Sequence, residues 1–328
     1  MRDIRKDKRT MSRILVTGGA GFIGSHLIER LLDQGHAVIC LDNFNDYYDP
    51  QLKRNNVAAF ADKPNVELVE GDIRDEAFLD KTFSEMRPNE IVHLAAMVGV
   101  RPSLAQPHLY EEVNGMGTLN LLEMSRKHEL ENFVFGSSSS VYGVNSKVPF
   151  SPDDPIAFPI SPYAATKRAN ELMCHTYHHL YGMKITCLRF FTVYGPRQRP
   201  DLAIRKFTDL IERGEPVPVY GDGTFKRDYT YVDDIMQGVL STLERKFDFE
   251  IFNLGESQTL ETLELVRLIE SALGKKANVE HMPVQPGDVP ITYADIDKSR
   301  SMLGYDPQVK IEEGIPLFVE WFRAQKEV

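Results

Sequence analysis

Cysteine, tryptophan and metal-ligand patterns are scarce in this chain. It has one tryptophan and three cysteines, Cys40, Cys174 and Cys187, among 328 residues. An odd, small number of cysteines without a CxxC pair argues against a disulfide framework and indicates reduced thiols in the cytoplasm. Nine histidines show no ligand spacing such as HExxH, and the three at 175–179 are typical of a helix surface, so we expect no metal site.

The chain also lacks long apolar runs and an excess of positive charge. No apolar run reaches the length of a membrane span, which argues against a membrane partner. Residues 1–10 are polar and basic without an apolar core, so they are no secretory signal; we expect a disordered extension, with Met11 a second possible start. A net charge of −10 argues against nucleic acid as a partner.

A glycine-rich turn lies between a predicted strand and a predicted helix near the amino terminus. Ile14, Leu15 and Val16 form a short apolar, partly β-branched run, and Gly18, Gly21 and Gly24 follow with a spacing of three. Glycines there permit a tight turn, backbone N–H contact with a pyrophosphate and a close helix–strand contact. An apolar stripe over 22–34 predicts the helix. A lone match of this kind is often only a surface turn.

An acidic residue strengthens the dinucleotide interpretation. The next predicted strand, 37–41, ends at Asp42, which lies close to the distance expected for the acid that binds the adenosine ribose. A carboxylate at this position repels a 2′-phosphate. The sequence therefore predicts NAD rather than NADP as the cofactor.

A second motif indicates what is done with the cofactor. Residues 161–168 read SPYAATKR, in which Ser161 can cap a helix and Tyr163 and Lys167 are spaced i and i+4 on one face. An ammonium near a phenol lowers the pKa of the phenol, so we expect Tyr163 to act as a base toward a substrate hydroxyl. An isolated Tyr-x-x-x-Lys is more often an ordinary helix surface, but here it follows a complete dinucleotide turn.

From residue 13 to about residue 321 the chain resembles the extended short-chain dehydrogenase/reductase family, specifically its nucleotide-sugar epimerases and dehydratases. Besides the two motifs, the resemblance rests on five segments in the order of the family. They read EGDIRD at 70–75, HLAA at 93–96, GSSSSVYG at 136–143, RFFTVYGP at 189–196 and RDYTYVDD at 227–234.

The resemblance implies roles for individual residues. Ser138 would position the substrate beside Tyr163, and Lys167 would also hold the nicotinamide ribose. The implied cofactor contacts are Gly18, Gly21, Phe22, Ile23, Gly24, Asp42, Asn43, Asp72, Ile73, Ala95, Tyr163 and Lys167. The expected substrate contacts are Arg101, Ser139, Ser140, Thr192, Arg199, Arg227 and Asp288.

The arrangement of predicted elements fits a Rossmann-type α/β fold. Strands are predicted at 13–17, 37–41, 66–70, 90–94, 132–137 and 184–190, and helices at 22–34, 75–86, 108–128 and 161–181. We expect a doubly wound parallel sheet in an NAD-binding domain at 11–191, followed by a smaller nucleotide-sugar-binding domain at 192–328. The resemblance implies that residues 232–254 return to the sheet.

Two features favour a UDP-uronic acid as the substrate. Residues 42–50 resemble the corresponding stretch of UDP-glucuronate 4-epimerases, and four hydroxyls, those of Ser138, Ser139, Ser140 and Thr192, match positions that surround the sugar carboxylate there. The serines could also be an ordinary serine-rich turn. Arg227 matches the arginine that binds the diphosphate, although it could instead be a surface arginine paired with Asp228. Many relatives carry arginine where this chain has Gln285. This chain therefore lacks one expected contact to the diphosphate and depends more on Arg227 to bind it.

The resemblance implies epimerisation at C4 through a transient 4-keto sugar, with hydride passing to NAD⁺ and back. Decarboxylases of the family usually carry an acid at the position of Ser140, and dehydratases carry Asp-Glu at 139–140, where this chain has two serines. A neutral UDP-hexose epimerase, a UDP-glucuronate decarboxylase and a catalytically silent NAD-binding regulator remain as alternatives. Relatives dimerise through a four-helix bundle, which segments 108–128 and 161–181 would build here.

Overall fold

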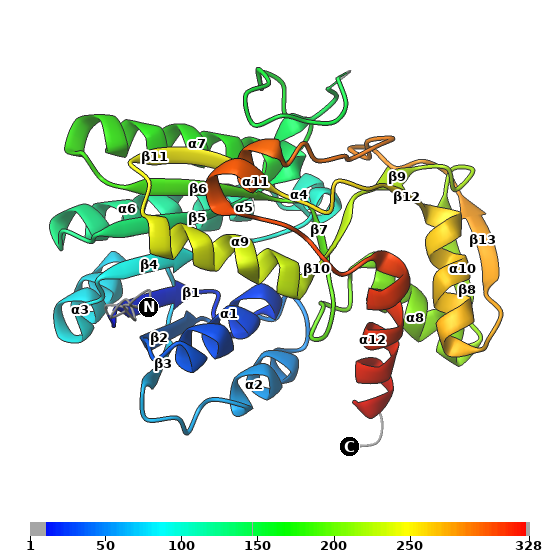
Figure 1. The fold of residues 1–328 in the computed structure, drawn as a ribbon, viewed down its shortest axis with the longest axis horizontal. Coiled ribbons are helices and arrows are strands. Elements are labelled where there is room, and N and C mark those ends of the chain that lie inside the picture. Colours follow the sequence, from blue (N-terminus) through cyan, green and yellow to red (C-terminus); the bar gives the residue numbers. More distant parts are fainter. Residues whose placement is uncertain (1–10, 146, 326–328) are drawn as a thin grey trace, which may run out of the picture.

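A seven-stranded, wholly parallel sheet forms the centre of the protein (Figure 1). The computed structural model describes residues 11–145 and 147–325, so the extension predicted at 1–10 lies outside the described residues. The strand order is β11-β6-β5-β4-β1-β2-β3. The strands are β1 Arg13–Thr17, β2 Ala37–Asp42, β3 Val66–Glu70, β4 Glu90–His93, β5 Asn132–Ser138, β6 Ile185–Phe190 and β11 Phe249–Leu254.

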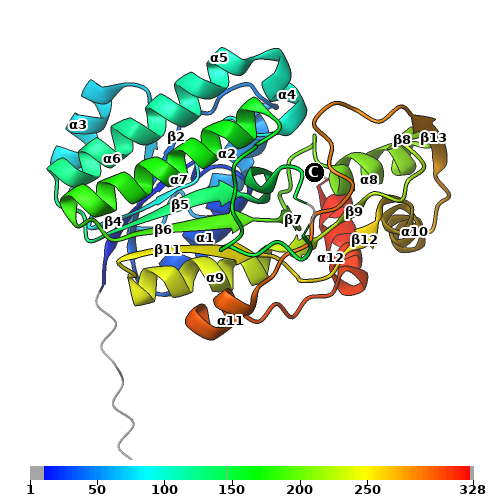
Figure 2. The same cartoon turned by 90° about the horizontal axis from the view of Figure 1, so that it is seen from above.

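Helices cover both faces of this sheet, which makes three layers (Figure 2). Alternate residues of β1 show the division, because Ile14 and Val16 pack into one apolar cluster and Leu15 into the other. The first cluster includes α1 Phe22–Asp33 and α9 Val232–Arg245. The second includes α3 Glu76–Met86, α6 Gly117–Lys127 and α7 Pro162–Tyr181. This is the predicted doubly wound α/β fold.

All six predicted strands and all four predicted helices are present, with shifts of one or two residues at their ends. Within residues 11–191, two helices were not predicted: α2 Pro50–Ala58 and α4 Val100–Ala105. Neither has an apolar stripe: only Lys53 and Val57 are buried on α2, and only Ser103 on α4. The helix predicted at 108–128 is divided into α5 Pro107–Tyr110, a π-helix η1 Glu111–Met116, and α6.

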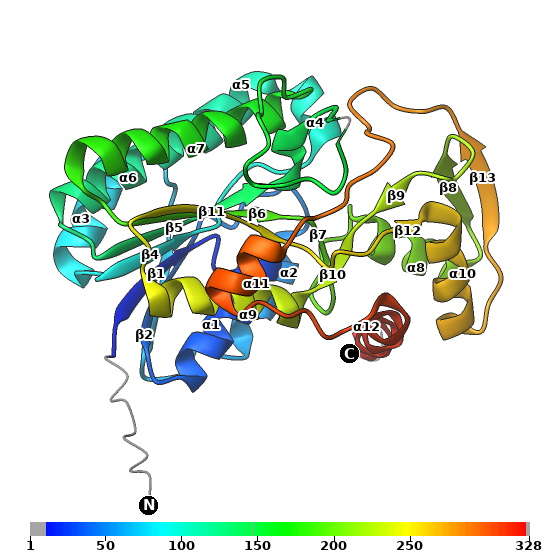
Figure 3. The same ribbon diagram turned by 45° about the horizontal axis from the view of Figure 1, so that its top comes forward.

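The carboxy-terminal third lies beside the carboxyl ends of the sheet strands (Figure 3). It contains three helices that contact one another, α8 Ala203–Arg213, α10 Thr262–Leu273 and α12 Ile311–Ala324. The remaining elements are short: η2 Ser139–Tyr142, β7 Thr192–Tyr194, β8 Pro216–Tyr220, β9 Lys226–Arg227, β10 Tyr229–Tyr231, β12 Leu260–Glu261, β13 Asn278–Met282 and α11 Asp297–Leu303.

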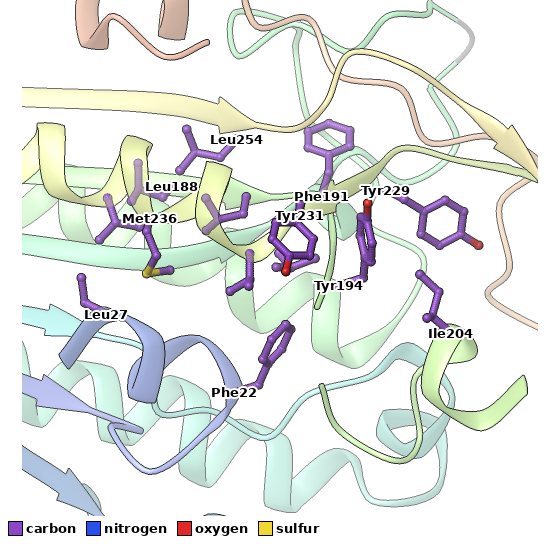
Figure 4. Close-up of a cluster of buried hydrophobic side chains, with 14 of the residues drawn as sticks. Phe22, Leu27, Leu188, Phe191, Tyr194, Ile204, Tyr229, Tyr231, Met236 and Leu254 are labelled. Carbon is purple, nitrogen blue, oxygen red and sulfur yellow. The ribbon is translucent and has the colours of Figure 1, made fainter. Parts of the chain in front are cut away.

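One apolar core continues from the sheet into this third (Figure 4). Phe22 of α1, Leu188 of β6 and Met236 of α9 belong to the same buried cluster as Tyr194 and Ile204. Residues 232–254 form α9 and β11, which packs against β6 at the sheet edge. The division at residues 191 and 192 into two domains stays a prediction. No helix in the described part of the chain is long and apolar enough to cross a membrane.

Candidate active site

A cavity of about 360 Å³ lies at the carboxyl ends of the central strands. Its wall is built from the turn after β1, the segments after β2, β3, β4 and β5, and the first turns of α7. In open parallel sheets, ligands bind outside the carboxyl ends of the strands, where the strand order reverses. Every residue predicted to contact the cofactor lines this cavity.

The glycine turn has the geometry that a bound pyrophosphate requires. Gly18 adopts φ +68, and a Cβ built there would lie 2.8 Å from the backbone N of Ala95. A Cβ on Gly24 would lie 2.3 Å from the carbonyl oxygen of Gly18, so this glycine permits the close contact of α1 with the turn. No side chain caps the amino terminus of α1. The first backbone N–H groups of this helix can therefore bind an anion such as a pyrophosphate.

Asp42 is buried at the end of β2, and one of its two carboxylate oxygens is hydrogen-bonded within the protein. Its Oδ1 accepts hydrogen bonds from the Phe44 backbone N at 2.9 Å and from Lys53 Nζ at 3.0 Å. No hydrogen bond to Oδ2 is formed by the described residues, so Oδ2 is available to ribose hydroxyls. Lys53 also lines the cavity. It was not predicted, because a lysine on a polar helix gives no sequence signal for burial.

The second acid of the cavity, Asp72, is held in its ionised form. Its carboxylate accepts hydrogen bonds from Arg74, through both Nε and Nη2, and from Asn43 Nδ2 at 3.1 Å. The hydrogen bonds from Arg74 lower the pKa of Asp72 to about 2. The glycine turn, the uncapped helix and these two carboxylates together fit a dinucleotide.

Tyr163 and Lys167 lie on the first turns of α7, as their spacing predicts. Ser161 caps this helix by accepting a hydrogen bond from the backbone N of Ala164 at 3.1 Å, and Pro162 occupies the first helical position. Lys167 Nζ donates to the carbonyl oxygen of Gly136 at 2.7 Å, which fixes the ammonium between α7 and β5. Both side chains line the cavity and are buried.

The expectation of a lowered pKa for Tyr163 is wrong. Burial raises the pKa of Tyr163, because an ionised phenol loses its hydration, while a hydrogen bond with Ser138 and the charge of Arg199 act in the opposite direction. Burial also lowers the pKa of Lys167, to about 8. Arg199 therefore emerges as a cation that favours the phenolate, a role that the sequence did not suggest.

The serines after β5 form a hydrogen-bonded turn. The backbone N of Ser140 donates to Ser138 Oγ at 3.1 Å, and the two hydroxyls lie 3.1 Å apart. Ser138 is thereby oriented by its own turn, beside Tyr163. Ser138, Ser139, Ser140 and Thr192 all line the cavity.

A second cavity of about 170 Å³ continues from the first. Ser139, Ser140 and Thr192 line both, and Arg227 and Asp288 line the second. Arg227 donates to the carbonyl oxygen of Lys226 at 2.8 Å. Asp228 does not pair with Arg227: its carboxylate is fully buried and accepts hydrogen bonds from the backbone N of Glu256 and of Ala294. The guanidinium of Arg227 is thus not neutralised by its neighbour.

Two predicted substrate contacts have partners within the protein. Arg101 lines neither cavity; its guanidinium is 2.6 Å from Asp288 and lies over the ring of Tyr220. Arg199 lines the first cavity, forms two hydrogen bonds with Asp201 and lies 5.8 Å from the centre of the Tyr47 ring. The structure brings Arg199 close to Tyr163 and leaves Arg101 at the edge of the second cavity.

The π-helix η1, which lies beside α7, was not predicted. Asn114, within η1, accepts from the backbone N of Met97 at 2.8 Å and donates to its carbonyl oxygen at 3.0 Å. The Asn114 side chain also donates to Thr166, and the carbonyl oxygen of Asn114 accepts from Asn170 Nδ2 at 2.9 Å. The π-helix therefore ties the segment after β4 to the helix that carries Tyr163 and Lys167.

Comparison with known proteins agrees with this geometry. Residues 15–317 match the family model described as GDP-mannose 4,6 dehydratase. The UDP-glucuronate 4-epimerase of Thermodesulfobacterium geofontis is 40% identical over 97% of this chain and 98% of its own.

Two solved structures superpose on nearly the whole chain. The UDP-glucuronic acid 4-epimerase of Bacillus cereus, in complex with UDP-glucuronic acid and NAD, is 35% identical with a TM-score of 0.90, over 95% of this chain and 99% of its own. The UDP-glucose 4-epimerase of Thermotoga maritima, with UDP-glucose, is 36% identical with a TM-score of 0.88, over 96% and 99%. This chain therefore belongs to the GDP-mannose 4,6 dehydratase family of extended short-chain dehydrogenases/reductases.

Proposed function

We propose that this protein is an NAD-dependent UDP-sugar 4-epimerase whose substrate is UDP-glucuronate, interconverted with UDP-galacturonate. The main supporting observation is that the two cavities adjoin. Tyr163, Lys167 and Ser138 line the first cavity, Arg227 and Asp288 line the second, and Ser139 and Ser140, which follow Ser138, line both. A sugar whose diphosphate is bound in the second cavity can reach the cofactor and the catalytic base through this junction.

The residues of the chain perform the proton chemistry and the positioning. Bound NAD supplies a hydride acceptor and donor for C4 of the sugar. The Tyr163 phenolate takes the proton of the 4-hydroxyl and later returns it, while Ser138 holds the same oxygen. Lys167 keeps a positive charge beside the phenol and the nicotinamide ribose. Between the two steps the 4-keto sugar turns about its diphosphate linkage, which Arg227 holds, and presents its other face.

A uronate is favoured by the groups at the junction. The hydroxyls of Ser139, Ser140 and Thr192 line both cavities and can donate to a carboxylate, and Arg199 adds charge on the same side. The 4-keto uronate is a β-keto acid that can lose CO₂. Several hydroxyl donors can hold its carboxylate in an orientation that disfavours cleavage of the C–C bond. Relatives at about 40% identity are named for this reaction.

The alternatives differ in specific residues. A decarboxylase or a dehydratase of this family would carry an acid at 139 or 140, where this chain has two serines. A neutral UDP-hexose epimerase is the second candidate, because the Thermotoga maritima enzyme is as similar as the uronate enzyme of Bacillus cereus. The complete set of Ser138, Tyr163 and Lys167 argues against an NAD-binding regulator without activity.

We further propose a cytoplasmic homodimer. Large apolar side chains are exposed beside one another on η1 and α7, namely Met116, Leu172, Met173, Leu180 and Tyr181. Leu172, Thr176 and Leu180 follow one face of α7, which is the pattern of a helix that packs on a partner helix. Three free, buried cysteines support a reducing compartment.

Proton NMR of the enzyme with UDP-glucuronate and catalytic NAD⁺ tests the substrate. We expect UDP-galacturonate without UDP-pentose. Formation of a UDP-pentose would instead identify a decarboxylase. Turnover of UDP-glucose or its N-acetylamino analogue, with none of UDP-glucuronate, would show that the hydroxyls at the cavity junction bind no carboxylate.

A further inference from the structure

Residues 195–202, between β7 and α8, form a segment that we call the strap (Figure 1). Two of its side chains, Arg199 and Leu202, belong to the wall of the cofactor cavity. None of its residues lines the second cavity, where the sugar nucleotide is proposed to bind. The strap therefore borders the cofactor cavity, where Arg199 also lies close to Tyr163, and does not border the second cavity.

One end of the strap is fastened to α1, the helix that follows the glycine turn. Arg197 forms two parallel hydrogen bonds with the Glu29 carboxylate, at 2.8 and 2.9 Å. On the same helix, His26 Nε2 lies 2.9 Å from the carbonyl oxygen of Pro196. The Arg197 and Glu29 side chains are only 19% and 29% exposed, so this bidentate pair is partly shielded from water.

The other side of the strap contacts the segment after β2. The Arg199 guanidinium lies over the ring of Tyr47, whose hydroxyl donates to the carbonyl oxygen of Val98 at 3.0 Å. Tyr47 and Val98 both line the cofactor cavity. The strap thus connects α1 to the opposite side of the cavity that the dinucleotide would occupy.

The strap is stiff, so it would move as a unit. Gln198 is 1% exposed; its side chain donates to the carbonyl oxygen of Val193 at 3.1 Å and accepts from the backbone N of Arg205 at 3.2 Å. Arg197 itself adopts φ +65, a left-handed conformation that is unfavourable for a residue with a side chain. The bidentate pair with Glu29 holds Arg197 in this conformation.

We propose that the Arg197–Glu29 pair is a latch that holds the strap over the bound dinucleotide and sets the rate at which the cofactor leaves. The inference rests on the proposed function. In an epimerase the cofactor returns to its starting state in every cycle, so only the sugar nucleotide must exchange. The strap can stay closed while the sugar nucleotide enters and leaves through the second cavity.

The test measures release of the cofactor, not only activity. Protein loaded with radiolabelled NAD⁺ is chased with excess unlabelled NAD⁺, and the label that remains bound is followed by filter binding. Glu29→Gln removes the charge and keeps the shape, and we expect its rate of label loss to rise at least about tenfold, as loss of a charge-assisted hydrogen bond predicts. Its turnover should decay on dilution and return when NAD⁺ is added.

Arg30→Gln is the matched control. Arg30 lies next to Glu29 on α1 and pairs with Asp233 at 2.7 Å, away from the strap. We expect its release rate to equal that of the wild type. The charge-reversed double variant, Glu29→Arg with Arg197→Glu, should regain slow release relative to either single reversal.

An unchanged release rate in Glu29→Gln would overturn the latch and leave the proposed function intact. Equal acceleration by Arg30→Gln would also overturn it, because a general loosening of α1 would then explain the effect. A wild-type protein that retains no label would likewise overturn the latch, whereas absence of epimerase activity in the presence of added NAD⁺ would contradict the proposed function itself.

Discussion

The chemistry depends on the phenol of Tyr163, and burial of this side chain opposes its ionisation. Burial raises the pKa of Tyr163, and a hydrogen bond with Ser138 and the charge of Arg199 offset part of that increase. Ser138 and Arg199 are therefore the groups of this chain that favour the phenolate.

Tyr163→Phe should abolish turnover and keep the cofactor bound. The substitution removes only the hydroxyl, so the cavity wall keeps its shape while proton transfer is lost. We expect the turnover rate to fall about a thousandfold, within the range for general acid–base groups. Rapid-quench assays and NAD⁺ titration measure the two effects, and retained turnover would remove Tyr163 from the proton-transfer step.

Arg199→Met should shift the pH profile to higher pH. Arg199 lowers the pKa of Tyr163 by its charge, so its removal raises that pKa further and reduces the phenolate fraction at every pH below it. The acid limb of kcat/KM should then move upward in pH, whereas Arg199→Lys should keep it near the wild-type position. An acid limb that stays in place in Arg199→Met would show that this charge does not act on the phenol.

Asp42→Ala should do more than relax cofactor choice. The substitution removes the ribose-binding carboxylate and also leaves Lys53, its buried partner, without a counter-charge in the cavity wall. We expect affinity for NAD⁺ to fall and affinity for NADP⁺ to rise about tenfold or more, since Lys53 can then bind the 2′-phosphate. Both dissociation constants can be measured by calorimetry.

The double variant Asp42→Ala with Lys53→Met separates the two effects. It lacks the acid and the ammonium alike, so its affinity for NADP⁺ should fall back below that of the single variant. Equal NADP⁺ affinity in both variants would exclude Lys53 from the change.

At the scale of elements, the π-helix η1 is the feature that most affects the position of the catalytic helix. The Asn114 side chain forms hydrogen bonds with the backbone N and carbonyl oxygen of Met97, after β4. It also donates a hydrogen bond to Thr166 on α7, one residue before Lys167. Buried amides of this kind stabilise only when every partner is present. π-Helical turns often occur at functional sites, and here the turn aligns α7 with the cofactor cavity.

Asn114→Ala should lower both stability and turnover. The backbone groups of Met97 would lose buried partners, which costs about 1–3 kcal/mol in the free energy of unfolding. We expect the turnover rate to fall at least tenfold, because α7 loses its link to the segment after β4. Denaturant melts and steady-state kinetics measure these changes.

Asn120→Ala serves as the control for this prediction. Asn120 lies on α6 in the same run of helix and bonds the carbonyl oxygens of Ile73 and Arg74, away from α7. It should lose stability and keep near wild-type turnover. If Asn120→Ala lost as much turnover as Asn114→Ala, any weakening of this run of helix would reduce turnover. The link from Asn114 to α7 would then not be the cause.

Most of the strands were predictable because they are short, largely apolar runs between polar turns, and burial on both faces is what such runs predict. The helices with apolar stripes were predictable for the same reason. Strand β3, VELVE, lies at the edge of the sheet and is mostly exposed. Helices α2 and α4 lack a stripe, and η1 differs from an α-helix only through contacts with residues distant in sequence, such as Met97 and Asn170. The local sequence pattern contains no information about such contacts.

At the scale of the molecule, the sheet and the carboxy-terminal third share one apolar core and form two joined cavities. The residues that the sequence predicted as cofactor contacts line the first cavity, because motif spacing fixes them relative to strand ends. The sequence did not predict which charges pair across the fold. Arg101 with Asp288, Lys53 with Asp42, and Glu29 with Arg197 all depend on tertiary placement.

Replacing the exposed apolar residues of α7 should separate the proposed homodimer. In Leu172→Glu with Leu180→Glu, two charges on one face would have to be buried at the interface, which disfavours association. Sedimentation velocity should show a dimer for the wild type and a monomer for the variant. Leu317→Glu, on α12 and 45% exposed, is the control and should stay dimeric. A wild-type monomer would contradict the proposal.

In the proposed reaction, the hydride removed from C4 is returned to C4 of the same sugar within one site. Mass spectrometry of the product from 4-deuterated UDP-glucuronate in ordinary water tests this return. We expect UDP-galacturonate that keeps its deuterium and incorporates none of the solvent hydrogen at carbon. Loss of the deuterium to solvent during epimerisation would contradict it, because the inversion would then proceed by proton exchange at carbon and not by hydride return.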